Sequence, residues 1–187
     1  MNKVISKVRV TEVDGLSDAL VRLYKADEGV SSDVFLKSVM DEIEKLSVAI
    51  TTAIKKDKVL SNLEEADIVR DEAVKNLSTL LDGYEVFPVA AKKEAVSLLD
   101  GIKEILEQIR SAQDAFVKAS DEYNAASTVK TESASSLKKP LLSAINDKFI
   151  PYITAMQMAN SAVYGDFAAK AEGEIKRVNE IVLRRGK

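Results

Sequence analysis

Two ionisable residues occupy helix positions that an apolar residue normally fills. On a helical wheel of residues 33–56, Glu42 lies inside the apolar stripe of that segment. On the next amphipathic segment, which starts near residue 61, Arg70 lies inside the stripe and Asp67 lies one turn before it. A buried charge without a partner is strongly unfavourable, so each side chain needs one. We expect Arg70 to pair with Glu42 directly, or with Asp67 or an asparagine.

Asparagines on later segments extend this set of polar residues. Asn146 and Asn160 fall on the apolar face of the segment around Pro151, and Asn179 flanks the apolar face of the last segment. The sequence therefore predicts a polar cluster inside a helical bundle. The members of this cluster are Glu42, Asp67, Arg70, Asn146, Asn160 and Asn179.

Three roles are open for the predicted cluster. A satisfied network of buried polar groups can fix the register of packed helices, which is the best-attested use of such groups. The cluster could also hold a small polar ligand or an ion, or Glu42 could act as a catalytic base. A carboxylate that an arginine holds ionised is a poor general base, so catalysis is the least favoured role.

Histidine and cysteine are both absent from the chain. Their absence excludes Ser-His-Asp catalysis, thiolate nucleophiles, disulfides, and zinc or iron sites held by these side chains. An all-carboxylate magnesium or calcium site is the metal site that these exclusions leave open. We expect no catalytic residue, no cofactor and no metal, and therefore not an enzyme.

The composition indicates a helical protein. The 187 residues include 7 glycines and 3 prolines, 5% are aromatic, and 30% are charged. The net charge of -3 gives no basic footprint for nucleic acid, which makes nucleic acid an unlikely partner. The basic end at residues 184–187 either completes a helix C-terminus or contacts nucleic acid or an anionic membrane, and the first reading is favoured.

No stretch of the chain has the residue pattern of a membrane-spanning or export segment. The longest apolar run falls well short of the roughly 20 residues that a membrane span needs. Charges interrupt residues 1–10 too often for the apolar region of a signal peptide. We expect a soluble, cytoplasmic protein that has no contact with a membrane.

The longest periodic pattern spans residues 89–126. Its apolar residues recur at steps of three and four, which is the period of a coiled-coil seam. They are Leu98, Ile102, Ile105, Ile109, Ala112, Phe116, Ala119 and Tyr123. The pattern predicts one long central helix, which an interior glycine at Gly101 weakens by about 1 kcal/mol. The seam is either covered by other helices of the chain or forms a dimer interface.

The other segments complete an all-α prediction. We expect an extended arm over residues 4–13, a short helix from Asp14, a helix capped by Ser32 over residues 33–56, and a helix opened by Ser61 and Glu64. The apolar stripe predicted for residues 33–56 is Phe35, Val39, Leu46, Ala49, Ile50 and Ala53. Two helices follow a polar loop, and Pro151 should kink the first of them. The sequence thus predicts an elongated up-and-down bundle of five to six helices in a single domain, residues 1–187.

One segment and its surroundings resemble a known protein family. Residues 65–73 contain an Asp-x-x-Arg-Asp motif, and residues 89–95 contain Lys-Glu-Ala. Together with Leu77, Tyr84, Glu42, Asn179 and Arg184-Arg185, they resemble an uncharacterised family of all-helical proteins common in Bacteroidetes. Members of that family are longer and insert helical material after the segment that matches residues 98–101. The resemblance implies a bacterial helical bundle and supplies no activity, ligand or catalytic residue.

The sequence favours a non-enzymatic helical protein that acts through contact with a protein partner or through its own dimerisation. An alternative is a bundle that binds a small polar ligand or an ion at the predicted cluster. A weaker alternative is association with nucleic acid through the basic C-terminal residues.

Overall fold

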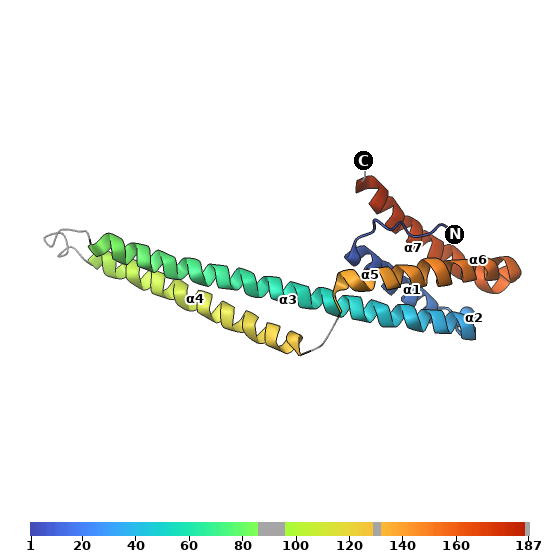
Figure 1. The fold of residues 1–187 in the computed structure, drawn as a ribbon, viewed down its shortest axis with the longest axis horizontal. Helices are drawn as coiled ribbons and strands as arrows, with labels where there is room; N and C mark the ends of the chain where they lie inside the picture. The colour runs from blue at the N-terminus through green and yellow to red at the C-terminus, as the bar shows by residue number, and fades with distance from the viewer. Residues whose placement is uncertain (86–95, 129–131, 186–187) are drawn as a thin grey trace. The chain divides into compact units, whose positions relative to one another are not determined.

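The computed structural model describes residues 1–85, 96–128 and 132–185, and of residues 84, 85 and 96–101 it describes the backbone only. Most of the described residues are helical and none of them forms a strand, so the all-α prediction is confirmed. Figure 1 shows the order of the elements. They are α1 (Val10–Ala26), α2 (Glu28–Ser31), α3 (Val34–Glu85), α4 (Val96–Ser127), α5 (Ala134–Ser143), the π-helical turn η2 (Ala144–Phe149), α6 (Ile150–Ala159) and α7 (Ser161–Arg185).

The predicted long helix corresponds to α4, which runs through Gly101 without a break. Its predicted first turn, from residue 89, lies outside the described residues. None of the helices in the described ranges is both long and apolar enough to cross a membrane.

Helix α3 is a single helix of 52 residues where the sequence reading predicted two. The predicted break rested on the charged residues 55–58 and on a capping box at Ser61 and Glu64. These signals are weak because no proline and no glycine interrupts the chain between Val34 and Asp82. A capping pair stabilises a helix start by only about 1 kcal/mol, which is too little to stop a helix that can continue.

Contacts divide the chain into two compact units. The first unit, which we call the body, comprises Met1–Ile54 and Thr131–Lys187. The second unit, which we call the hairpin, comprises Lys55–Lys130. Helix α3 contributes its first part to the body and its second part to the hairpin.

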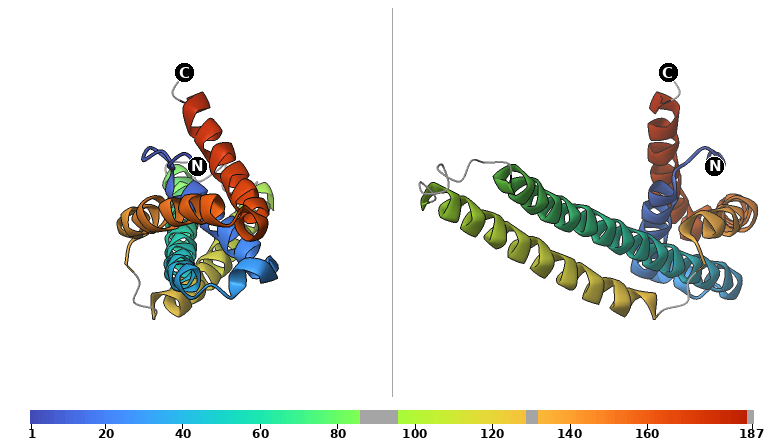
Figure 2. Two further views of the ribbon diagram at one scale, coloured as in Figure 1. Left: turned by 90° about the vertical axis from the view of Figure 1, so that its right-hand side faces the viewer. Right: turned by 60° about the vertical axis from the view of Figure 1, so that its left-hand side comes forward.

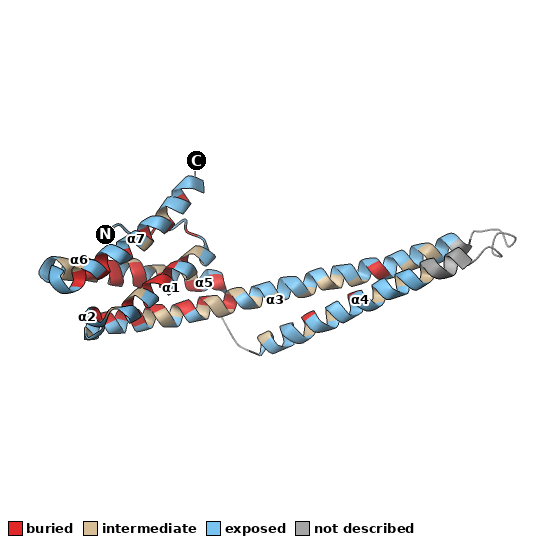
Figure 3. Cartoon of the chain, turned by 180° about the vertical axis from the view of Figure 1, so that it is seen from behind, coloured by how far each residue is buried: buried red, intermediate tan, exposed pale blue. Residues whose placement is uncertain are grey.

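The body surrounds a continuous apolar core. Helix α1 packs against α5 and α7, and α6 packs against α7. The largest fully buried side chains are Phe149, Phe167, Leu16, Leu20, Leu36, Met40, Ile43, Ile50, Leu141, Ile145, Ile153 and Ile175. Figure 3 shows, in red, where buried residues lie along the helices of the body.

Two details of the body differ from the sequence reading. Helix α1 begins at Val10, so the extended arm is shorter than predicted. Phe35 is 53% exposed, whereas Leu36, Met40 and Ile43 are buried. The wheel was anchored on the aromatic residue, but Phe35 lies in the first turn of α3 and packs on Tyr152, with ring centroids 4.4 Å apart.

The π-helical turn η2 lies directly before Pro151, where the sequence predicts a kink. The amide of Ile150 donates to the carbonyl of Ile145, five residues earlier. Proline has no amide hydrogen and its ring crowds the carbonyl four residues before it, and a wider turn relieves that clash. The turn also carries Asn146 and Asp147, which contact the N-terminal arm.

Candidate functional site

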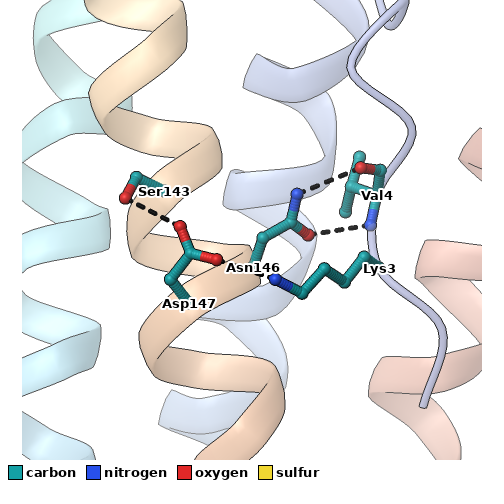
Figure 4. A network of polar contacts seen from close by, with 5 residues as sticks. All are labelled: Lys3, Val4, Ser143, Asn146 and Asp147. Atoms are coloured by element: carbon teal, nitrogen blue, oxygen red, sulfur yellow. Dashed lines mark hydrogen bonds and ion pairs between the residues drawn. The ribbon is translucent and has the colours of Figure 1, made fainter.

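Asn146 binds the main chain of the N-terminal arm. Its Oδ1 accepts a hydrogen bond from the amide of Val4 at 2.8 Å, and its Nδ2 donates to the carbonyl of the same residue at 3.0 Å. Figure 4 shows these two bonds between η2 and the arm. One carboxamide therefore satisfies both backbone groups of Val4.

Asn179 on α7 binds the residues on either side of Val4. Its Oδ1 accepts from the amide of Ile5 at 2.9 Å, and its Nδ2 donates to the carbonyl of Lys3 at 2.9 Å. In an extended chain, the backbone groups of one residue point to one edge and those of its neighbours point to the other. The two asparagines thus hold both edges of residues 3–5, as neighbouring strands would in a sheet.

An ion pair adds side-chain recognition to this contact. The ammonium of Lys3 lies 2.9 Å from Oδ1 of Asp147, and the hydroxyl of Ser143 donates to Oδ2 of Asp147 at 3.0 Å. The hydrogen bonds from Lys3 and Ser143, with the charge of Lys3, hold the pKa of Asp147 below its usual value. Both ends of this pair are more than half exposed, so the pair orients the arm more than it stabilises it.

Apolar burial anchors the same segment. Val4 is 3% exposed and Val8 is fully buried in the core of the body. Open grooves flank the arm, one of about 830 Å³ along α7 that includes Lys3, Ile5 and Gly173. The other groove, of about 520 Å³, includes Ser6, Lys138 and Leu142. We call the surface formed by Asn146, Asp147 and Asn179 the arm site.

The remaining members of the predicted cluster lie elsewhere. Lys148 donates to both carboxylate oxygens of Glu42, at 2.7 and 2.6 Å. The side chains of this ion pair are 48% and 42% exposed, so Glu42 is not a core residue. Asn160 accepts from the amide of Val163 at 3.3 Å in the first turn of α7.

Arg70 lies in the hairpin and does not pair with Glu42. Its guanidinium lies 2.5 Å from the carboxylate of Asp67 and 3.1 Å from that of Asp71, and it covers the ring of Phe116 at 4.2 Å. Its side chain is 29% exposed, which leaves it in contact with water. The structure thus brings together Asn146 with Asn179, and Asp67 with Arg70, and separates the two pairs between the body and the hairpin.

The sequence reading missed a carboxylate that joins three helices of the body. Asp33, rather than the predicted Ser32, caps α3: its Oδ1 accepts from the amides of Phe35 and Leu36 at 2.9 and 3.0 Å. Its Oδ2 accepts from the phenols of Tyr152 and Tyr164 at 2.5 and 2.6 Å. An aspartate directly before an apolar helix start was the available signal for the cap, but nothing in the sequence pointed to the two tyrosines.

The electrostatics of this triad make it structural rather than catalytic. Burial alone would raise the pKa of Asp33, but hydrogen bonds from the two phenols and two amides outweigh it and hold the pKa below its usual value. Burial and the bond to Asp33 raise the pKa of Tyr152 to about 12, and the bond to Asp33 and burial raise that of Tyr164 to about 12. Phenols that stay protonated and a carboxylate with four donors offer neither a base nor a nucleophile.

Two buried hydroxyls join α1 to α3. The hydroxyl of Ser17 lies 2.8 Å from that of Ser47, which donates to Asp18 at 2.7 Å. No histidine exists to activate either serine, so this contact fixes the register of the two helices. Within the described ranges, the acidic side chains form no group of three or more that could hold a metal ion.

In the hairpin, the second part of α3 and α4 lie side by side and antiparallel (Figures 1 and 2). Arg70 contacts Phe116, and a groove of about 390 Å³ is lined by both Ala73 and Ala112, so residue numbers rise along one helix as they fall along the other. The covered side of α4 follows the predicted seam from Ile102 to Tyr123. The residues of α3 that form the other half of this seam are Val59, Leu63, Ala66, Arg70, Ala73, Leu77 and Leu80.

No protein-family model, no curated protein and no solved structure matches this chain.

Proposed function

We propose that this protein is a non-enzymatic helical protein that acts through protein–protein contact, and that its hairpin pairs with the hairpin of a second copy. The observation that carries the proposal is that α3 and α4 cover the apolar seam between them only in part. Among the described side chains of the hairpin, those that are buried are alanines: Ala73, Ala112 and Ala119. The isoleucines Ile102, Ile105 and Ile109 of the same seam are only partly covered.

Residues that directly follow a seam residue form one face of the hairpin, which we call the trailing face. Residues that directly precede a seam residue in sequence, such as Val69 and Ala115, lie on the opposite face and line the groove of about 390 Å³. The trailing face carries large apolar side chains that are 41–51% exposed. These are Leu60, Val74, Leu81, Leu106 and Val117.

The charged residues of the trailing face have opposite signs on its two helices. On α3 the charged residues of this face are Glu64, Asp67 and Asp71, which are all acidic. On α4 they are Lys103 and Arg110, which are both basic. A second copy related by a twofold axis along the hairpin would place its α4 against α3 and its α3 against α4. Apolar side chains of the two copies would then meet in the centre of the interface.

Sedimentation equilibrium of the full chain tests this pairing. Leu106→Glu places a charge in the centre of the trailing face and should shift the protein towards monomer. The matched control is Ile68→Glu, because Ile68 is 65% exposed and lies on the side of α3 opposite the seam. A parent protein that stays monomeric over the whole concentration range, or a Leu106→Glu variant that associates as the parent does, contradicts the proposal.

We also propose that the chain belongs to the all-helical family common in Bacteroidetes that its sequence resembles. The Asp-x-x-Arg-Asp segment of this chain carries the resemblance. Its residues Asp67, Arg70 and Asp71 lie in or beside the seam of the hairpin. We further propose a bacterial protein that works in the cytoplasm without a cofactor and without binding nucleic acid. Elemental analysis of the purified protein and retention on heparin at low salt test the last two statements.

A further inference from the structure

We propose that the arm site binds an extended peptide segment of a partner protein, and that residues 3–5 of the chain occupy this site as an internal competitor. The ligand class is a short extended segment with a basic residue followed by two β-branched residues. This inference concerns the body and is independent of pairing through the hairpin.

The arm site recognises main chain. All four hydrogen bonds from Asn146 and Asn179 go to backbone groups of Lys3, Val4 and Ile5. Such contacts hold any extended segment that has amide hydrogens at the second and third positions. Main-chain bonding to both edges of a strand is a general means of binding extended peptides.

Side chains of the arm define which segments fit best. Asp147 lies 2.9 Å from the ammonium of Lys3 and favours a basic first residue. The second position is apolar and enclosed, because Val4 is 3% exposed. A β-branched residue suits this position because its side chain favours the extended conformation that both asparagines require.

The arm fills only part of the space around it. Grooves of about 830 and 520 Å³ lie against residues 2–6, along α7 and along α5 and η2. Lys138 and Lys139 line the smaller groove, and Glu172 and Glu180 line the larger one. A longer segment could therefore make contacts on both sides that the arm does not make.

A partner segment can bind only when it displaces residues 3–5 from the arm site. A segment tethered to its own site acts at an effective concentration of about millimolar or higher. A short peptide in solution loses to the arm of the parent chain and gains access when the arm is weakened. Substitutions at Lys3 and Val4 weaken the arm and leave Asn146, Asp147 and Asn179 unchanged.

The test uses fluorescence anisotropy of a labelled peptide with the sequence of residues 1–9 and the full-length chain. We expect the Lys3→Glu/Val4→Gly chain to bind this peptide at least about tenfold more tightly than the parent chain does, since weakening the arm removes its competition. Circular dichroism establishes that the variant is folded. The Lys3→Glu chain serves as a second variant, because the Lys3 side chain is 64% exposed and its replacement leaves the core intact.

Two matched controls test recognition of the main chain. Adding Asn179→Ala to the arm variant removes two of the four hydrogen bonds and should weaken peptide binding by about tenfold or more. A peptide methylated on the amide of Val4 loses the bond to Asn146 and should bind poorly. A peptide methylated on the amide of Asn2 should bind as the unmodified peptide does, because the arm site contacts residues 3–5.

Several outcomes would overturn the proposal. Folded arm variants that do not bind the peptide would show that the arm is a fixed part of the core. Binding that is insensitive to Asn179→Ala would place the peptide elsewhere. A dimer of the parent that disappears in the arm variants but persists in Leu106→Glu would assign the site to the arm of a second copy.

Discussion

The body and the hairpin use the same helical pattern and reach different degrees of burial. In the body, aromatic and branched side chains such as Phe149, Phe167 and Ile43 are fully enclosed. In the hairpin, Ile105 and Phe116 hold equivalent inward positions and remain partly exposed. The periodicity of a helix fixes which side faces a neighbour, but the number of neighbours decides how much of that side leaves water.

The difference extends to the polar residues of each unit. In the body, Asp33 has four hydrogen-bond donors, and Asn146 and Asn179 bind backbone groups of the arm. In the hairpin, Arg70 takes a seam position and keeps its guanidinium partly in water. A two-helix layer tolerates a charged seam residue because it never encloses that residue.

Core truncation should show the largest difference between the two units. Phe149→Ala leaves a cavity in the body and should lower the free energy of unfolding by about 3–5 kcal/mol. Ile109→Ala in the hairpin removes a partly exposed side chain and should cost about 1 kcal/mol, because its neighbours already contact water. Urea unfolding followed by circular dichroism measures both. Equal losses at the two positions would contradict the contrast.

The next effect concerns polar groups. Asn179→Ala leaves the amide of Ile5 and the carbonyl of Lys3 without their partner and should cost about 1–2 kcal/mol in the same unfolding measurement. The matched hairpin variant is Asn76→Ala, because Asn76 is exposed and lines an open groove. That change should stay within about 0.5 kcal/mol. A larger loss from Asn76→Ala would reverse the expected order.

Stability of the body should depend on pH at both ends of the range. The folded-state pKa of Asp33 is lowered from 3.8, so its stabilising contribution is present above that value and lost as pH falls below it. The pKa of Tyr164 is raised from 10.0 to about 12, so its contribution is present below pH 10 and is lost as pH rises towards about 12. Thermal melts across pH should show both losses, and Asp33→Asn combined with Tyr164→Phe should flatten the profile. A double variant with the parent's profile would exclude the triad as its source.

A small effect on stability is expected at the seam arginine. Arg70→Leu exchanges an ion pair that is partly exposed for an apolar contact with Phe116, and the two should balance within about 1 kcal/mol. Arg70→Ala loses both contacts and should be the less stable of the two variants. Thermal melts of both variants at one protein concentration test this order. A large loss in Arg70→Leu would mean that Arg70 is a buried partner after all.

The sequence predicted some parts of this structure better than others, because the pattern of apolar residues is clearer in some helices than in others. The seam of α4, from Ile102 to Tyr123, was predicted correctly because a long amphipathic helix repeats its pattern many times. At the start of α3 the predicted stripe was wrong at Phe35, which is exposed, whereas Val39, Ile50 and Ala53 are buried as predicted. The grouping of the helices into the body and the hairpin could not be read from the sequence, because periodicity shows the inward side of a helix and not which helices cover it.

The polar residues show the same limit. Asn146 and Asn179 were selected because they interrupt apolar faces, and their contacts with an arm far away in sequence could not be read from spacing. Glu42 and Arg70 were grouped because each fell on a predicted inward face. Glu42 pairs with Lys148, which is far away in sequence and is brought close only by the packing of the helices. Arg70 pairs with Asp67, which lies one turn earlier on the same helix.

Hydrogen exchange read by mass spectrometry at two protein concentrations tests the central contrast most directly. The body encloses its own core, so its protected amides should exchange at the same rate at both concentrations. The hairpin should exchange faster than the body at the low concentration and slow down at the high concentration, as pairing with a second copy covers the trailing face. A hairpin as protected as the body at low concentration, with no change at high concentration, would contradict the account.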